Sequence, residues 1–131
     1  MNNHKVQSLV AEWDEVYKKG QLSLWVLLAV YDGKKYAAQI SDYMSKATNG
    51  GFEVREQSLY RALRRFDDMG LVRMTLEESP SSGPKRKYYH LTEIGEAVVG
   101  RFVERNIAPL LQPEIITLLH SVQQKGYHHE S

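Results

Sequence analysis

A row of polar side chains near the middle of the chain has the chemistry of nucleic-acid binding. Gln57, Arg61 and Arg64 are spaced so that they share one face of an α-helix. Amide and guanidinium groups form paired hydrogen bonds with the edges of adenine and guanine in the DNA major groove. We call these three residues the reading row. Arg61 can also be an ordinary solvated arginine, so its role depends on the segments around it.

Other residues of the same segment are further candidates for DNA contact. They are Ser58, Tyr60 and Arg65. Tyr60 can alternatively be a half-buried packing residue, and Arg65 can pair with Asp68 across one helical turn.

A second basic group, Lys85, Arg86 and Lys87, follows a polar stretch rich in turn residues over positions 77–84. We call these three residues the basic wing segment. Its cations can neutralise phosphates of a DNA backbone. They can also be a solvated strand edge, because lysine and arginine discourage strands from pairing with other chains. We favour phosphate contact.

The sequence offers no residue set for catalysis. The 131 residues include no cysteine and five histidines, and the histidines lack metal-ligand spacing. A glycine-rich phosphate loop, a nucleophile elbow and a paired-carboxylate signature are also absent. We therefore expect no enzyme activity, no metal site and no cofactor. The formal net charge is only +1, but a segregated basic face can still hold a polyanion.

The reading row needs a helix that is anchored on its other side. Within residues 56–69, the apolar side chains fall opposite the reading row, and they are Leu59, Ala62, Leu63 and Phe66. Gly70 follows where a left-handed residue would end the helix. This predicts an exposed, DNA-reading helix.

The remaining periodicity predicts the elements around that helix. Apolar spacing favours helices over 4–19, with Gly20 as a stop, and over 22–31 and 36–47. In 22–31 the expected inward stripe is Leu24, Leu27, Leu28 and Tyr31.

After residue 70 the apolar period changes from 3.6 to 2, which predicts a β-hairpin from 71–76 and 86–91. Its alternation places Lys87, Tyr89 and Leu91 on the face opposite Tyr88. Thr92 is expected to open a further helix that ends near Ala108, since Pro109 and Pro113 follow. Helical spacing resumes over 114–123.

Three helices followed by a hairpin predict an α+β, mostly α fold, a winged helix-turn-helix. We expect an N-terminal amphipathic helix over 1–20, the DNA-binding domain over 21–92, C-terminal dimerisation helices over 93–125 and a disordered tail over 126–131. No apolar run is long enough for a membrane span, and the first residues lack a signal segment. These features favour a cytoplasmic protein.

The terminal helices carry more apolar residues than a lone domain of this size would bury. We expect them to pair across a two-fold axis. The predicted dimerisation residues are Val6, Val10, Trp13, Tyr17, Phe102, Val103, Ile107, Ile115 and Leu119. Alternatively, the N-terminal helix folds back over its own subunit and only the C-terminal helices dimerise.

Two separated motifs resemble the PadR family of transcriptional regulators. One is Ser58 to Phe66 with Met69-Gly70-Leu71-Val72, and the other is Gly83 to Gly95, which includes Pro84-Lys85-Arg86-Lys87-Tyr88-Tyr89 and Leu91-Thr92. The resemblance covers about residues 22–103. The sequence departs from the family at Tyr36-Ala37-Ala38, where a second aromatic residue is missing, and at Arg55, where the family often has a serine or threonine cap.

We expect a sequence-specific DNA-binding regulator that represses transcription. We expect it to act as a homodimer on a palindromic operator in double-stranded DNA, because a reading surface this small binds weakly unless two half-sites are engaged. Some regulators similar to this family bind flat aromatic molecules near the dimer interface. Trp13 and Trp25 are the candidates for such an effector pocket, and the alternative is that both are plain core residues. Two further interpretations stay open: a winged-helix module that binds protein, and an architectural DNA binder without sequence preference.

Overall fold

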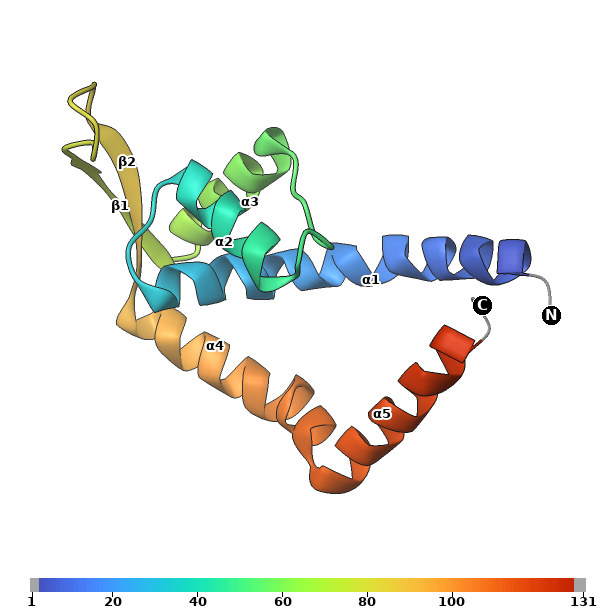
Figure 1. Cartoon of the computed structure of the whole chain (residues 1–131). Helices are drawn as coiled ribbons and strands as arrows, with labels where there is room; N and C mark the ends of the chain where they lie inside the picture. Colours follow the sequence, from blue (N-terminus) through green and yellow to red (C-terminus); the bar gives the residue numbers. More distant parts are fainter. Residues whose placement is uncertain (1–2, 129–131) are drawn as a thin grey trace. The chain divides into compact units, whose positions relative to one another are not determined.

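The computed structural model describes residues 3–128, whose helices and strands are drawn in Figure 1. The chain divides into two compact units. The winged unit spans Gly20–Val99. The terminal unit comprises the described residues before Gly20 and after Val99. The predicted domain over 21–92 lies inside the winged unit.

The first helix, α1 (Asn3–Asp32), runs through Gly20 without a break. The prediction that Gly20 stops the helix is wrong. A glycine inside a helix costs only about 1 kcal/mol relative to alanine, and the helical residues on both sides outweigh that cost. Lys35 closes the C-terminal end, because its Nζ donates to the Ala29 carbonyl oxygen at 2.7 Å and to the Asp32 carboxylate at 3.0 Å.

Two shorter helices form the helix-turn-helix. These are α2 (Ala37–Ala47) and α3 (Glu56–Asp68). Ile40 and Met44 of α2 are buried, as are the four predicted anchor residues of α3. Gly70 has φ +78°, and its amide donates to the Asp67 carbonyl at 3.0 Å. The sequence-based interpretation of this helix and its glycine stop is confirmed.

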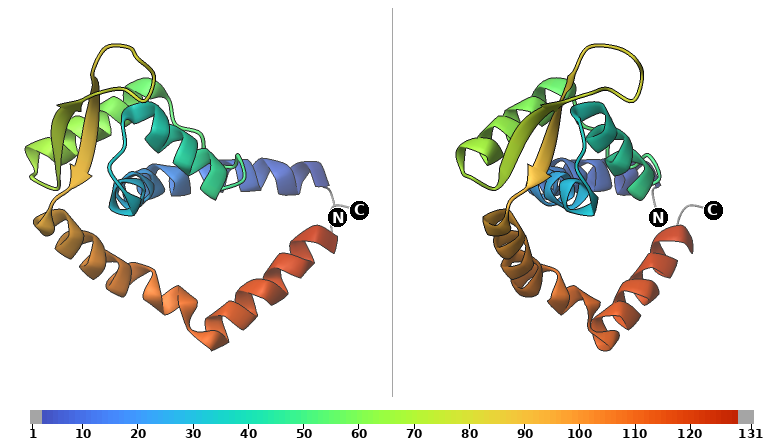
Figure 2. Two further views of the ribbon diagram at one scale, coloured as in Figure 1. Left: turned by 60° about the vertical axis from the view of Figure 1, so that its left-hand side comes forward. Right: turned by 90° about the vertical axis from the view of Figure 1, so that its left-hand side faces the viewer.

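The predicted hairpin is present as β1 (Val72–Glu77) and β2 (Arg86–Leu91), paired antiparallel with Val72 opposite Leu91 and Glu77 opposite Arg86. The backbone of Lys35 pairs with Tyr89 on the other edge of β2, with N–O distances of 3.2 and 2.8 Å. The hairpin is therefore joined to the segment that precedes α2. In both views of Figure 2 its tip extends beyond the helices of the winged unit.

Burial in the hairpin departs from the predicted alternation. Tyr88 and Tyr89 point to opposite faces, yet both are buried. Tyr88 is covered because its ring packs edge-on against Tyr36. Met74 and Leu76 share the face of Val72 but are exposed, because the hairpin leaves the core soon after Val72.

The next helix, α4 (Glu93–Asn106), begins at Thr92 as predicted. The Thr92 hydroxyl donates to the Gly70 carbonyl oxygen at 2.7 Å and accepts from the Gly95 amide at 2.9 Å. A short 3-10 helix, η1 (Ala108–Leu111), separates α4 from α5 (Pro113–His128). The expected break near Ala108 is therefore present. The prediction of a disordered tail over 126–131 is wrong for residues 126–128, which are helical. Residues 129–131 lie outside the described part.

All buried apolar residues in the described chain lie between positions 26 and 99, inside the winged unit. The predicted inward stripe of the second helix is partly wrong. Val26, Ala29 and Val30 are buried there, whereas Tyr31 is 64% exposed. This half of α1 is apolar on more than one side, so a single stripe was the wrong pattern. Within residues 3–128, no helix is long and apolar enough to cross a membrane.

Candidate nucleic-acid interface

The exposed surface of α3 has a crest formed by the reading row. Gln57, Arg61 and Arg64 are all exposed, while Leu59, Leu63 and Phe66 on the opposite face are at most 3% exposed. Within residues 3–128, no hydrogen bond or ion pair occupies the three crest side chains. The helix therefore offers free donor and acceptor groups from a fixed base.

The two flanks of α3 face different neighbours. On one flank, the Arg65 guanidinium lies 3.4 Å from the Ser23 hydroxyl of α1 and 5.2 Å from the centre of the Phe66 ring. The alternative, an ion pair of Arg65 with Asp68, is not present among the described residues. On the other flank, Glu56 and Tyr60 face a groove.

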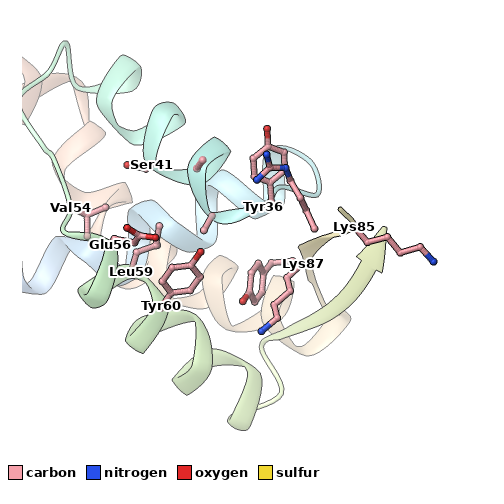
Figure 3. A pocket seen from close by; sticks show the side chains of 12 residues that line it. Tyr36, Ser41, Val54, Glu56, Leu59, Tyr60, Lys85 and Lys87 are labelled. Atoms are coloured by element: carbon pink, nitrogen blue, oxygen red, sulfur yellow. The ribbon is translucent and has the colours of Figure 1, made fainter. Parts of the chain in front are cut away.

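The groove has a volume of about 510 Å³ and is drawn in Figure 3. Its walls are the start of α2, the first turns of α3 and strand β2, and its lining includes Tyr36, Ser41, Glu56, Tyr60 and Lys87. Figure 3 shows the side chains of Tyr60 and Lys87 on the same side of the groove, from α3 and the hairpin respectively. The groove thus joins the reading helix to the basic wing segment.

The three cations of the basic wing segment are held differently. Lys85 extends outward from the end of the hairpin in Figure 3, and both lysines are exposed. The Arg86 guanidinium instead lies 4.6 Å from the centre of the Tyr36 ring, and its Nε donates to the Ser79 hydroxyl at 3.1 Å.

Tyr89 of β2 also lines the groove. Burial raises the pKa of its hydroxyl, electrostatic interactions with Tyr60 and Asp67 raise it further, and Arg64 opposes the shift. Tyr89 is only 8% exposed. It therefore stays neutral at physiological pH and adds no negative charge to the groove.

The hairpin also carries a polar cluster around Glu77, on the face that bears Arg86 and Tyr88. Its carboxylate pairs with the Lys34 ammonium and accepts from the Thr75 hydroxyl at 2.6 Å. His90 Nε2 lies 3.1 Å from the same carboxylate. Hydrogen bonds from Lys34, then Thr75 and His90, lower the pKa of Glu77 to about 2 against the opposing effect of burial. This cluster ties both strands to the segment before α2.

The structure brings Tyr60, Lys85, Arg86 and Lys87 together at one groove and leaves Gln57, Arg61 and Arg64 on the adjacent crest. Ser58 is half-buried. Sequence reasoning missed Tyr36 and Glu56, because neither lies on the crest or among the basic residues. The aromatic residue directly before a predicted helix was the available signal for Tyr36.

Five of the nine predicted dimerisation residues are exposed to solvent in the single chain. Val10, Trp13, Tyr17, Phe102 and Leu119 are between 44% and 74% exposed. The other predicted members are half-buried, and they are Val6, Val103, Ile107 and Ile115. Trp13 lines a recess of about 180 Å³ with Val10, Asp14 and Tyr17, whereas Trp25 is half-buried in the winged unit. The effector pocket stays a prediction.

Comparison with known proteins identifies the fold and the family. The family model described as "Transcriptional regulator PadR-like family" matches residues 26–101, more than half of the chain. A PadR-like transcriptional regulator from Bacillus cereus is 33% identical, with a TM-score of 0.57 over 72% of this chain and 94% of that one.

Two more distant structures share the fold. A PadR family transcriptional regulator from Eggerthella lenta has a TM-score of 0.64 at 23% identity, covering 88% of this chain and 96% of its own. Bacillus subtilis PadR, solved in complex with operator DNA, has a TM-score of 0.57 at 16% identity, covering 79% of this chain and 59% of its own. Both have the winged helix-turn-helix arrangement in common with this chain.

Proposed function

This chain belongs to the PadR-like family of transcriptional regulators, and we propose that it is a sequence-specific repressor that binds a palindromic operator as a homodimer in the cytoplasm. The observation that carries the proposal is the exposed, unoccupied reading row beside a groove lined with cations and tyrosine hydroxyls. The operator complex of Bacillus subtilis PadR supports DNA as the ligand.

In the proposed complex, α3 enters the major groove and the reading row contacts base edges. An arginine pairs with O6 and N7 of guanine, and a glutamine pairs with N6 and N7 of adenine. The apolar anchor of α3 fixes the direction of these side chains, so that only a matching set of base pairs accepts them. This accounts for discrimination among sequences.

The groove is the proposed seat for the adjacent phosphates. Lys87 and Arg86 supply charge, and the Tyr60 hydroxyl, on a side chain that is 42% exposed, supplies a hydrogen-bond donor. Contacts of this kind set the register of the protein on the duplex and carry no sequence information themselves. They also make the affinity depend on salt.

A homodimer is proposed because the terminal unit leaves large apolar side chains in water. Trp13 is 74% exposed and Phe102 is 44% exposed. Contiguous exposed apolar surface on a small protein commonly marks an interface. Two copies related by a two-fold axis would present two reading helices to two half-sites about 34 Å apart.

The proposal includes a small aromatic effector that relieves repression. The support is the exposed indole of Trp13, which lines a recess with Val10 and Tyr17. A flat ring could stack on such an indole. Trp25 is the second predicted contributor.

The test is selection of a binding sequence from a pool of random duplexes, followed by affinity measurement at one fixed salt concentration. We expect a selected site with two-fold symmetry that binds about 10³-fold or more tightly than random DNA. Equal affinity for all duplexes would favour the architectural alternative. Absence of DNA binding, with the protein folded, would favour a module that binds protein.

Repression is tested separately, with a reporter gene placed behind the selected site. Expression of the intact chain should lower reporter output, and the same chain carrying Arg61→Ala should not. A rise in output would assign activation instead.

A further inference from the structure

Four side chains on and beside strand β2 form a continuous array of cations and aromatic rings. The Arg86 guanidinium lies 4.6 Å from the centre of the Tyr36 ring. Tyr36 and Tyr88 meet edge-on, with ring centres 5.4 Å apart and planes at 86°. The Lys34 ammonium lies 5.4 Å from the centre of the Tyr88 ring. The array therefore connects β2 to the segment that precedes α2.

Tyr36 is the fixed member of this array. Its backbone amide donates to the Gln39 side-chain oxygen at 3.2 Å, and the ring rests on Tyr88, which is only 7% exposed. The neighbouring Lys35 is paired with Tyr89 through two backbone hydrogen bonds. The Tyr36 ring is thus half-buried and held in place by its neighbours, whereas Arg86 is an exposed side chain that rests on this ring.

The contact leaves most of the Arg86 donors free. Nε donates to Ser79 at 3.1 Å, and within residues 3–128 the two terminal nitrogens donate to no protein acceptor. A guanidinium that lies on a ring keeps the donors in its own plane available to a second partner. Both Tyr36 and Arg86 line the groove proposed to hold DNA phosphates.

We infer that Tyr36 is a positioning residue for DNA binding: its ring holds the Arg86 guanidinium in the groove with its terminal N–H groups directed to a phosphate oxygen of the operator. The inference rests on the proposed function, because it needs DNA in the groove. An unrestrained arginine must be ordered when it binds, and that ordering weakens association. A platform that orders it beforehand should tighten operator binding by about 3- to 10-fold.

The experiment is a double-mutant cycle on the full chain, read as affinity for the duplex that the wild-type protein selects. Tyr36→Phe keeps the ring and should stay within about two-fold of wild type. Tyr36→Leu removes the ring and should lose about 3- to 10-fold. In a protein that already carries Arg86→Gln, Tyr36→Leu should cause no further loss of affinity, because the arginine that Tyr36 positions is absent.

Tyr43→Leu is the matched control. Tyr43 also carries a cation over its ring, with Lys35 Nζ at 4.9 Å, but it does not line the groove. This control should bind the operator like wild type. The melting temperature of every variant shows whether a loss of affinity comes from removal of the Tyr36 ring or from unfolding of the protein.

A second measurement needs no variant. If Arg86 rests on Tyr36 in the free protein, the ring current of Tyr36 should shift the NMR signals of the Arg86 side chain upfield. Signals typical of a free arginine would overturn the inference even if no leucine variant folds.

The outcomes distinguish the two proposals. Equal affinity of the wild-type protein for all duplexes would remove the proposed function. Loss of operator affinity in Arg86→Gln, together with normal affinity in Tyr36→Leu, would remove only the role of Tyr36. The role of Tyr36 would also be contradicted if the losses of operator affinity from Tyr36→Leu and Arg86→Gln were additive in the double variant.

Discussion

Arg61 is the central residue of the reading row, and the proposed function depends on it more than on any other side chain. Its neighbours on the crest, Gln57 and Arg64, lie one helical turn away on either side. A base contact made from this position is surrounded by further contacts and is shielded from water. Loss of Arg61 should therefore affect discrimination as well as affinity.

We predict that Arg61→Ala weakens operator binding by about 1–3 kcal/mol and relaxes the preference at one or two base pairs. The measurement is affinity for the operator and for single-base variants of it. Arg73→Ala, which removes an exposed arginine from β1, is the control and should keep the base preference. Equal losses on operator and random DNA would assign Arg61 to phosphate contact alone.

A second residue-scale constraint lies in the packing of α4 against the hairpin. A Cβ at Gly95 would approach the Leu71 carbonyl oxygen to 2.2 Å and Leu91 Cδ1 to 2.7 Å. The Leu71 carbonyl is held in place because it accepts from the Thr92 amide at 3.0 Å. There is no room for a side chain at this crossing.

Gly95→Ala should consequently destabilise the protein by about 1–3 kcal/mol, the usual cost of overpacking. Urea denaturation measures it. Gly100→Ala is the matched control on the same helix, because a Cβ there meets nothing within 4 Å. It should stabilise by up to about 1 kcal/mol through helix propensity. Equal effects of the two substitutions would show that α4 does not pack this closely.

At the scale of elements, the continuity of α1 distinguishes this chain from the predicted pair of helices. Gly20 lies inside the helix, and a Cβ there would meet no atom within 4 Å. Gly20→Ala should therefore raise the free energy of unfolding by about 0.5–1 kcal/mol. Gly70→Ala is the contrasting variant: with φ +78° it should lower that free energy. A destabilising Gly20→Ala would argue for a break at this position.

The hairpin contributes a stability term that depends on pH. The folded-state pKa of Glu77 is about 2, against an ordinary value of 4.5, so its ionised form is favoured by folding. The sign follows from linkage: this stabilisation is fully present above about pH 4.5 and is lost as the pH falls towards 2. Glu77→Gln should flatten the decline in stability across this window. Glu78→Gln, at the exposed neighbouring position, should leave the wild-type decline unchanged.

The elements that the sequence predicts well are those defined by local patterns. The anchor of α3, the glycine at position 70 and the Thr92 start of α4 each follow from spacing within a few residues. The errors arise where distant residues decide. Tyr88 is buried by Tyr36, which lies about fifty positions earlier in the chain. The alternation of residues within a strand cannot predict a contact with so distant a segment.

The groove shows the same limit. Its basic residues and Tyr60 are visible in the sequence, because cations and motif positions can be recognised locally. Glu56 and Tyr36 become part of it only when α2, α3 and β2 are packed together. The contact between Tyr36 and Arg86 likewise depends on how these elements pack together, so no single element predicts it.

At the scale of the whole molecule, the open apolar surface of the terminal unit calls for a partner. Leu118, Leu119 and Val122 of α5 are between 52% and 67% exposed. If these residues form the subunit interface, the C-terminal helix is needed for association and the winged unit is not.

A chain ending at Arg105 should accordingly be a folded monomer by light scattering and circular dichroism, while the intact chain is a dimer at micromolar concentration. Operator affinity of the shortened chain should fall about 10²-fold or more, because the second half-site is lost. A chain ending at His128 is the control and should remain a dimer. A shortened chain that still dimerises would contradict the C-terminal interface and favour one made by α1.

The separation of the reading row from the buried face of α3 also bears on how such a regulator changes over time. The core of the described chain contains no buried polar or charged residue, and within residues 3–128 the crest side chains make no hydrogen bond or ion pair. Substitutions on the crest should therefore leave folding within about 0.5 kcal/mol. Duplicated genes for such a regulator could therefore diverge towards new operators through mutations of the crest alone. A library of variants at positions 57, 61 and 64 should consist mainly of folded proteins.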